Sequence, residues 1–376
     1  MLSLYLHVPF CLRKCPYCGF YSTVYSEQLA NEYLDALHLE AAGYHHAFDN
    51  QVIDTVYWGG GTPTVLSLEQ MQRLIGVIRD HFLVARDAEW TIEANPNSVS
   101  LPQLVSLREA GVNRLSLGIQ SFNDKILKAL GRLHSAAEAA AAFRHARKAG
   151  FSNIGVDLIY GVPGQTTEEW NKTLDETIGL QPEHVSAYSL SLDEGSRFMD
   201  EAMAGRFALS EDDQVASLYE HAVEKLGRAG YHRYEVSNFS LPGYACRHNV
   251  NYWARGEYLG LGPAAWSFVN QKRYHAVADV REYVARLKTG RSVIEGEEVT
   301  NSRQAANETI MLSLRTTAGL DLVRFGKDFG KAALTQLEHQ AALLKQQGLL
   351  ETDEGRIMLT ERGLLIANEA LARLAL

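Results

Sequence analysis

The chain has 376 residues, enough for a large domain and a smaller second one. Hydrophobic residues make up 46% and charged residues 22%, an ordinary composition for a soluble globular protein. The formal net charge of -9 argues against a general nucleic-acid binder, because such proteins carry basic surfaces that neutralise phosphates.

The N-terminal sequence MLSLYLHVPFCLRKC has no basic start and no small-residue cleavage site. It is therefore not a signal peptide. No apolar run approaches the roughly 20 residues that span a bilayer. We expect a cytoplasmic protein.

A repeated alternation of strand and helix fills the first 200 residues. The predicted strands are short apolar runs ended by Gly, Pro or polar residues: Leu2–Val8, Thr55–Gly59, Trp90–Ala94, Arg114–Gly118, Ile154–Tyr160 and Val185–Leu192. Helical spacing and capping residues predict the helices between them: Gln28–Ala42, Ser67–Phe82, Pro102–Ala110, Ser135–Ala149 and Glu168–Leu180. Six such units predict an α/β fold with a parallel sheet and crossover helices. Because a complete (β/α)8 barrel needs two more units, we expect an open, partial (β/α)6 barrel.

The rest of the chain has a different pattern. Glu211–Ala229 is predicted to be helical, and the Gly- and aromatic-rich stretch Tyr231–Ser267 gives only weak secondary-structure signals. Three helices follow, with a short hairpin before the last: Asn307–Leu314, Ala332–Gln347, the hairpin strands Leu349–Glu351 and Arg356–Leu359, and Thr360–Ala375. This order resembles a winged helix, but without a basic stripe it favours a structural or docking domain over DNA binding. We divide the chain into a barrel (1–230), a connecting segment (231–300) and a mostly helical C-terminal domain (301–376).

Three of the four cysteines, Cys11, Cys15 and Cys18, lie in the loop that follows the first predicted strand. Three thiolates can bind three irons of a [4Fe-4S] cluster and leave the fourth iron open for a small molecule. A structural zinc site is less favoured, because it needs four ligands and the fourth would have to be His7 or the distant Cys246. Cysteines without any ligand are the remaining alternative.

The spacing of these cysteines resembles the signature of the radical S-adenosylmethionine (SAM) superfamily. In that superfamily the open iron chelates SAM, and an electron from the cluster cleaves the sulfonium to a 5′-deoxyadenosyl radical. The resemblance implies that Tyr17 lies beside the adenine and that Gly60, Gly61 and Thr62 bind the amino group of SAM. It further implies that Glu93 accepts hydrogen bonds from the ribose. The alternatives are a simple glycine turn and a solvated or helix-capping acid.

Further segments resemble the oxygen-independent coproporphyrinogen III oxidase family: Leu115–Phe122, Leu130–His134, Asp157–Thr166, Tyr188–Leu190 and Tyr258–Gly262. The family resemblance implies that Tyr5, Gln120, Arg132 and Asp157 contact SAM, and it leaves open whether one or two SAM molecules bind. Alternatively, Tyr5 fills the barrel, and Arg132 and Asp157 form a structural ion pair.

Within this family, the sequence is similar to the haem-chaperone branch. True oxidases have a fourth cysteine two residues after the third, where this chain has Phe20, and a long N-terminal extension before the cluster. Arg247–Trp253 contains the HNxxYW motif of the chaperone branch. The resemblance implies a protein that binds haem and transfers it to haemoproteins. Radical decarboxylation of coproporphyrinogen III is the alternative function, and a zinc-dependent or winged-helix interaction module is the third.

The HNxxYW motif supplies the haem candidates His248, Tyr252 and Trp253. Histidine is a common axial ligand of haem iron, and aromatic rings suit a flat apolar macrocycle. A packed aromatic turn with a hydrogen-bonded histidine is the alternative. Trp266 stands where relatives have a histidine, so we expect it to reshape the SAM or haem pocket. The implied partners are haem and haem-acceptor proteins, membrane-associated respiratory enzymes among them, and no nucleic acid. A monomer and a homodimer both stay open.

Overall fold

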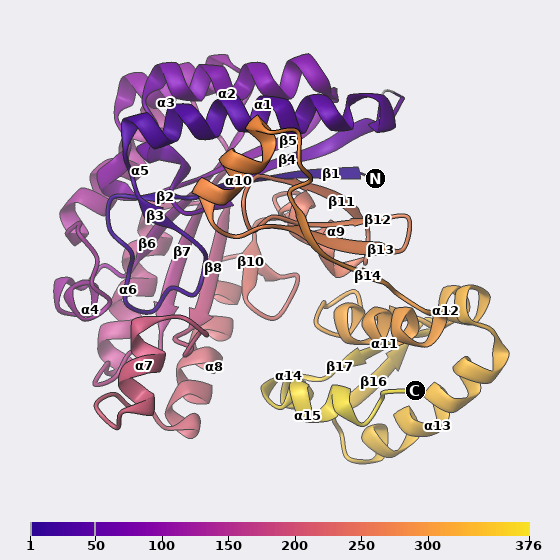
Figure 1. The fold of residues 1–376 in the computed structure, drawn as a ribbon. Coiled ribbons are helices and arrows are strands. Elements are labelled where there is room, and N and C mark those ends of the chain that lie inside the picture. Colours follow the sequence, from indigo (N-terminus) through magenta and orange to yellow (C-terminus); the bar gives the residue numbers. More distant parts are fainter. Residues whose placement is uncertain (1, 49) are drawn as a thin grey trace.

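A 12-stranded mixed sheet forms the framework of the computed structural model, which describes residues 2–48 and 50–376 (Figure 1). Six neighbouring strands are parallel: β1 (Leu2–Val8), β4 (Val52–Gly60), β5 (Leu83–Ala94), β6 (Arg114–Gln120), β7 (Ile154–Tyr160) and β8 (His184–Ser189). They follow one another in chain order across the sheet. The predicted six-unit partial barrel is confirmed.

Helices connect the parallel strands and cover the outside of the sheet (Figure 1). They are α1 (Glu27–Phe48), α2 (Leu68–His81), α3 (Leu101–Glu109), α4 (Asp124–Ala129), α5 (Ala136–Lys148) and α6 (Thr167–Leu180), followed by α7 (Arg197–Met203) and α8 (Asp212–Arg228). Capping boxes begin α2 at Ser67, α5 at Ser135 and α6 at Thr166, as expected from Ser or Thr followed three residues later by Gln or Glu. None of the described helices is long and apolar enough to cross a bilayer.

The segment after residue 230 extends both edges of the sheet. Its elements are β9 (His232–Arg233), β10 (Asn238–Ser240), α9 (Arg247–Trp253), β11 (Glu257–Leu261), β12 (Trp266–Val269), β13 (Lys272–Ala276), α10 (Val280–Lys288) and β14 (Ile294–Val299). Strand β11 is parallel to β1, whereas β10 is antiparallel to β8, and β12, β13 and β14 are antiparallel to their neighbours. Strands and a helix therefore occupy Tyr231–Ser267, where the secondary-structure signals of the sequence are weak. The three domain ranges stay a prediction.

The C-terminal part has its own apolar core and a three-stranded sheet in the order β15, β17, β16. Its elements are α11 (Ser302–Ser313), β15 (Leu320–Asp321), α12 (Leu322–Phe329), α13 (Lys331–Gln346), β16 (Leu350–Asp353), β17 (Arg356–Leu359), α14 (Glu361–Leu365) and α15 (Ala367–Ala372). The predicted hairpin is confirmed by the pairing of β16 with β17. The single helix predicted for Thr360–Ala375 is wrong, because Ile366 leaves helical geometry and divides it in two.

Glu40 is a buried acid that ties α1 to the end of β11 and to α10. Its carboxylate accepts hydrogen bonds from the backbone N–H of Gly262 at 2.8 Å and from the Tyr283 hydroxyl at 2.6 Å. Burial nevertheless raises the pKa of Glu40 from 4.5 to about 7. The folded protein therefore holds a proton here at pH values where the unfolded chain has released it.

We predict that this proton makes folding pH-dependent. Because the folded pKa is raised, the stabilising contribution is full below about pH 4.5 and is lost as the pH rises to about 7. Glu40→Gln should flatten that part of the profile when urea unfolding of the apoprotein is measured from pH 4.5 to 8. Glu220→Gln, an exposed substitution on α8, is the control. Parallel profiles for the native chain and Glu40→Gln would contradict the prediction.

Candidate functional site

The three clustered cysteines lie in one loop at the C-terminal end of β1. The short strands β2 (Phe10–Cys11) and β3 (Thr23–Val24) pair with each other and close this loop at its base. Farther out, the Phe198 N–H donates to the Pro16 carbonyl at 2.8 Å and fixes the loop to the start of α7. All three cysteines are half-buried, and none forms a disulfide. The loop therefore presents three free thiols from a fixed backbone.

A cavity of about 520 Å³ adjoins the cysteine loop at the C-terminal ends of the barrel strands. All three cysteines line it, together with eight of the SAM candidates: Tyr17, Gly60, Gly61, Thr62, Glu93, Gln120, Arg132 and Asp157. Tyr5 is not among the lining residues. Its ring stacks on Tyr57 with 6.3 Å between centroids, and its hydroxyl lies 3.2 Å from the ring of His7. Tyr5 thus packs behind the cavity wall.

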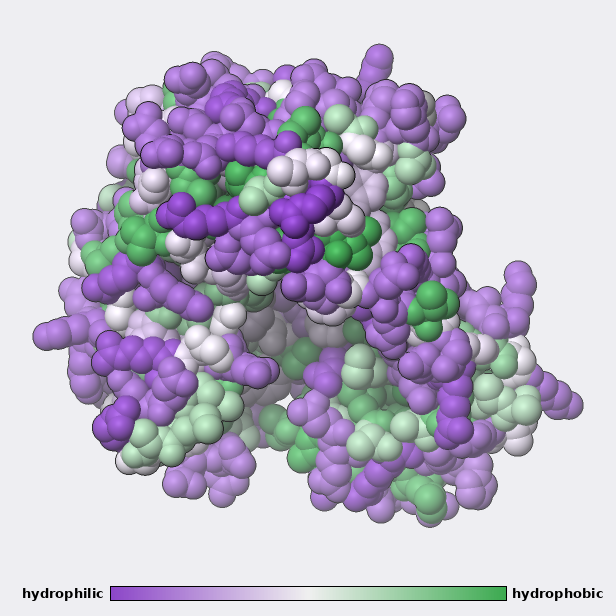
Figure 2. All heavy atoms as spheres, in the orientation of Figure 1, coloured by the Kyte–Doolittle hydropathy of each residue, from purple (hydrophilic) through white to green (hydrophobic). Residues whose placement is uncertain are grey.

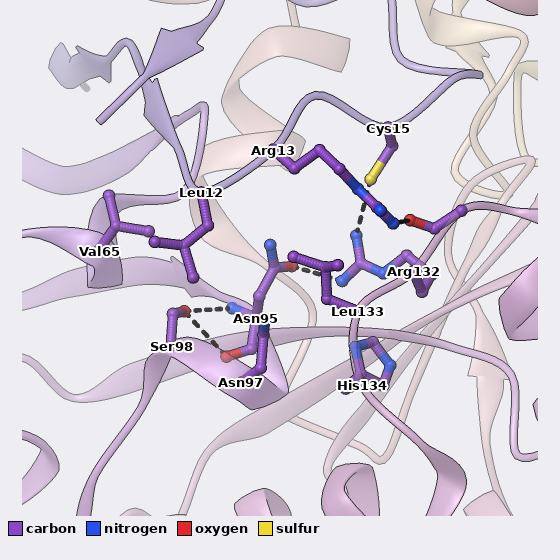
Figure 3. Close-up of a pocket in the computed structure, with 11 residues that line it drawn as sticks. Leu12, Arg13, Cys15, Val65, Asn95, Asn97, Ser98, Arg132, Leu133 and His134 are labelled. Carbon is purple, nitrogen blue, oxygen red and sulfur yellow. Dashed lines mark hydrogen bonds between the residues drawn. The ribbon is translucent and has the colours of Figure 1, made fainter. Parts of the chain in front are cut away.

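Arg132 connects the cysteine loop to the ends of two strands (Figure 3). Its Nη1 lies 3.5 Å from Cys15 Sγ and 3.4 Å from the Tyr17 hydroxyl. Its Nη2 donates to Asn95 Oδ1 and to the Gly118 carbonyl, each at 2.6 Å. Within the described residues no ion pair joins Arg132 to Asp157, so the structural pair considered above is not formed.

Gly118 and Gln120 give β6 an unusual end. A Cβ on Gly118 would lie 3.0 Å from both Asn95 Oδ1 and Gln120 Nε2, so a side chain would crowd the contacts of Arg132. Gln120 has φ of 69°, a left-handed conformation that costs a non-glycine residue roughly 1–3 kcal/mol. Such strain is concentrated at functional sites, which fits the position of Gln120 on the cavity wall.

The glycine loop at the end of β4, residues 60–62, lines the cavity and also packs closely against the backbone that follows β1. A Cβ on Gly61 would lie 2.5 Å from the Phe10 carbonyl oxygen. The N–H groups of Gly61 and Thr62 donate to the carbonyls of Val8 and Phe10 at 2.9 and 2.7 Å. Glycine therefore lets this loop pack directly against the start of the cysteine loop.

Two half-buried carboxyl groups lie on the cavity wall and accept hydrogen bonds from neutral donors. Glu93 accepts from the Tyr57 hydroxyl at 2.8 Å, and Asp157 accepts from Ser116 Oγ at 3.1 and 3.2 Å. Burial raises the pKa of Glu93 from 4.5 to about 7 and also raises the pKa of Asp157. Both groups can therefore receive hydrogen bonds from hydroxyls or balance a cation.

Sequence reasoning assigned no role to Tyr57, Ser116 or Asn95. Tyr57 and Ser116 line the cavity two residues before Gly59 and Gly118 on their strands. Side chains two residues apart in a strand point to the same face, and that periodicity was the signal that could have found them. For Asn95, which bonds both Arg132 and Thr62, no sequence signal existed beyond its position at a strand end.

The donor set suits an iron–sulfur cluster. Burial raises the pKa of Cys11 and raises that of Cys18 to about 11, so iron binding must release protons from these thiols. Among the described residues, no three His, Cys, Asp or Glu side chains surround a single ion position. A [4Fe-4S] cluster does not require this, because each thiolate binds a different iron. Three free thiols beside a polar cavity therefore fit the cluster and one further polar ligand.

His248 does not reach the cysteine cavity. Its side chain is buried, with 1% of the residue exposed. Its Nδ1 lies 2.8 Å from Thr55 Oγ1, and its Nε2 lies 2.9 Å from the Tyr252 hydroxyl. Burial lowers the pKa of His248 to about 3, so the ring is neutral. Both ring nitrogens have protein partners, and Trp253 of the same motif lines a different cavity.

The other candidate iron ligands are also engaged. Nε2 of His7 lies 2.9 Å from the Tyr21 carbonyl oxygen, and the buried Cys246 thiol donates to Glu89 at 3.4 Å. Trp266 is 49% exposed and packs on His275, with 4.5 Å between ring centroids. It lines neither the cysteine cavity nor the cavity that Trp253 lines, and its effect on a SAM or haem pocket stays a prediction.

Partial barrel, cysteine loop and polar cavity together define a radical SAM protein. Residues 5–177 match the model of the Radical SAM superfamily, and residues 301–366 match the HemN C-terminal domain. The structure is similar to that of coproporphyrinogen III oxidase (HemN) from Escherichia coli, with a TM-score of 0.87 and 26% identity. That match covers 100% of this chain and 90% of the oxidase.

Sequence relatives show to which family within this superfamily the chain belongs. The chain is 35% identical to the heme chaperone HemW of Bacillus subtilis, over 98% of each chain. It is 36% identical to the HemW of Mycobacterium tuberculosis (strain H37Rv), covering 99% of this chain and 94% of the relative. It is 38% identical to the HemW of Escherichia coli, covering 70% and 69%. The chain belongs to the HemW family, and membership of the radical SAM superfamily implies SAM and a [4Fe-4S] cluster.

We predict that the Arg132 guanidinium holds the cysteine loop in place before any cluster binds. Arg132→Lys keeps the charge but loses the planar fork that joins Cys15, Asn95 and Gly118. Losing one to two hydrogen bonds of this kind, about 1.5 kcal/mol each, should speed amide exchange in residues 11–24 of the apoprotein by roughly ten- to a hundredfold. Arg79→Lys, which affects a bond from α2 to the Ala110 carbonyl, is the control. Unchanged exchange in residues 11–24 would contradict this role.

Proposed function

We propose that this chain is a haem chaperone that binds haem and transfers it to acceptor haemoproteins. The observation that carries the proposal is the 35% identity to a heme chaperone HemW over 98% of both chains. The acceptors in this proposal include membrane-associated respiratory enzymes, and the chaperone acts in the cytoplasm. Transfer requires that the protein bind haem firmly and still release it to the acceptor.

In this proposal, Cys11, Cys15 and Cys18 hold the [4Fe-4S] cluster, and SAM occupies the adjoining cavity. With three thiolate ligands from the protein, the cluster would leave one iron open to bind SAM. The SAM contacts come from the cavity wall: Tyr17, Gly60, Gly61, Thr62, Glu93, Gln120, Arg132 and Asp157. Tyr5 acts indirectly, through its packing on Tyr57.

The second candidate function is oxygen-independent oxidation of coproporphyrinogen III. The TM-score of 0.87 to the Escherichia coli oxidase favours it. Phe20 argues against it, because this residue stands where the oxidase branch has a fourth cysteine near the cluster. Phe20 is 65% exposed and lies at the edge of the cysteine cavity, where its phenyl ring supplies no iron ligand.

We predict that the three clustered cysteines alone determine cluster content. Cys15→Ala should abolish the brown chromophore after anaerobic reconstitution, because one iron loses its only protein ligand. Iron and sulfide analysis measures the loss. Cys246→Ala should keep the full cluster, since Cys246 lies buried against Glu89 and away from the cavity. Full cluster content in Cys15→Ala would disprove the assignment.

We predict haem transfer without oxidase turnover. The reconstituted protein loaded with haemin should pass it to apomyoglobin, measured by the growth of the myoglobin Soret band. The same sample, given SAM, a reductant and coproporphyrinogen III, should form no protoporphyrinogen IX. Steady turnover on the order of 1 per second would instead support the oxidase function. Absence of haemin binding would refute the chaperone function.

A further inference from the structure

A second cavity, of about 690 Å³, lies between the connecting segment, residues 231–300, and the C-terminal domain; we call it the interdomain cavity. Residues of α9 and of the β12–β13 turn form one wall, and residues from α11 to α12 form the other. Figure 2, drawn from another side of this cavity, shows a separate hollow between the part of the barrel that carries α7 and α8 and the C-terminal domain. The volume of the interdomain cavity falls within the roughly 300–1,000 Å³ typical of sites for organic ligands.

Aromatic side chains from both domains line this interdomain cavity. Trp253 comes from α9, and Phe325 and Phe329 come from α12, with 4.9 Å between the centroids of the two phenyl rings. Trp253 is only half-buried. Flat rings on facing elements suit a flat apolar ligand, because stacking buries a large area of both partners.

Polar groups on the same walls lack partners. The Arg255 side chain is 9% exposed and has φ of 53°, yet its Nη2 is buried without a hydrogen-bond acceptor among the described residues. Its other nitrogens bond Glu308 at 2.7 Å and Gln271 at 2.8 Å. The hydroxyl of Thr300, also on the cavity wall, is buried and unpartnered. A buried donor without an acceptor costs about 1–3 kcal/mol, which a carboxylate ligand would offset.

Two further guanidinium groups reach the cavity. Arg324 pairs with Asp328 at 3.5 Å, and Arg356 pairs with Asp321 at 3.3 Å. The Arg324–Asp328 pair is exposed, so opening it costs little. A ligand with one or two carboxylates can therefore engage Arg324 in addition to the free Nη2 of Arg255.

We propose that the interdomain cavity binds the porphyrin cargo, with its ring against the half-buried Trp253 and Phe329 and its propionates on Arg255 and Arg324. This inference rests on the proposed chaperone function and adds the location of the cargo. The lining residues include no His, Cys or Met. The Tyr234 hydroxyl is already bonded to His184 at 2.8 Å. The iron therefore keeps a free axial position for a ligand from the acceptor, which favours release.

In this arrangement His248 is a positioning residue that holds α9 in place. Asn249 of α9 lines the cysteine cavity, whereas Val250 and Trp253 line the interdomain cavity. The bonds from His248 to Thr55 and Tyr252 hold this helix between the two cavities. The HNxxYW sequence thus forms the wall that separates the SAM site from the cargo site.

The test is a haemin titration of the full-length, reconstituted protein, followed by the Soret band. Trp253→Ala and Arg324→Glu should each weaken haemin binding about tenfold or more. Lys327→Glu, with the same charge change on the same helix but outside the cavity, should bind as the native chain does. Haemin dimethyl ester, which lacks the carboxylates, should bind weakly and be insensitive to Arg324→Glu. The cluster absorbance of every variant reports that the barrel has folded.

The outcomes separate the inference from the function on which it rests. If the native chain binds no haemin, the chaperone function fails. If it binds and transfers haemin while Trp253→Ala and Arg324→Glu bind within twofold of it, the inference alone fails. His248→Gln should keep the position of the Soret band, because neither ring nitrogen binds iron. A shifted band in His248→Gln would overturn the inference in favour of ligation by His248.

Discussion

Parallel strands end at one edge of a sheet, and this constraint determines where the chemistry of the molecule lies. Because β1, β4, β5, β6 and β7 run the same way, the cysteine loop, the glycine loop, Glu93, Gln120 and Asp157 meet at that edge although 146 residues separate Cys11 from Asp157. Arg132 then joins the cysteine loop to the ends of β5 and β6 through hydrogen bonds rather than through apolar packing. Strand pairing and the hydrogen bonds of Arg132 together thus bring the walls of the cavity into place.

The sequence predicted β1, β6 and β7 well because each is an almost continuous buried run. The bounds of β1 and β7 agree with the prediction at both ends. The strands between residues 231 and 300 were missed because they have two to six residues and depend on distant partners. Strand β11, for example, pairs with β1, which lies about 250 residues earlier. Local propensity carries no information about such pairing.

The residues of the candidate site, like the strands, were predicted only in part. Residues within motifs, such as Gly60 and Gln120, line the cavity as the family resemblance implied. Tyr57 belongs to no motif, and Ser116 lies within a family segment without an implied role, yet these two residues supply donors to the two half-buried carboxyls. The HNxxYW motif was interpreted as one haem surface, but its helix turns His248 inward and Trp253 toward the C-terminal domain. A linear motif does not tell which face of a helix each residue will occupy.

The charged and titratable groups of the cavity are of different kinds at its two ends. Arg132 is the cation at the cysteine side, where three thiolates add negative charge once a cluster forms. Glu93 and Asp157 share the cavity wall with the buried Arg114, and burial raises the pKa of both carboxyls although this cation partly offsets the effect. A sulfonium ligand bound beside them would favour their ionised forms, because an opposite charge nearby offsets the desolvation of a carboxylate. Before any ligand binds, the raised pKa values therefore favour the protonated forms of Cys11 and Cys18 at one end of the cavity and of Glu93 and Asp157 at the other. Cluster binding releases protons from thiols, whereas a cation bound beside the carboxyls lowers their pKa, so the two binding steps depend on pH through different groups.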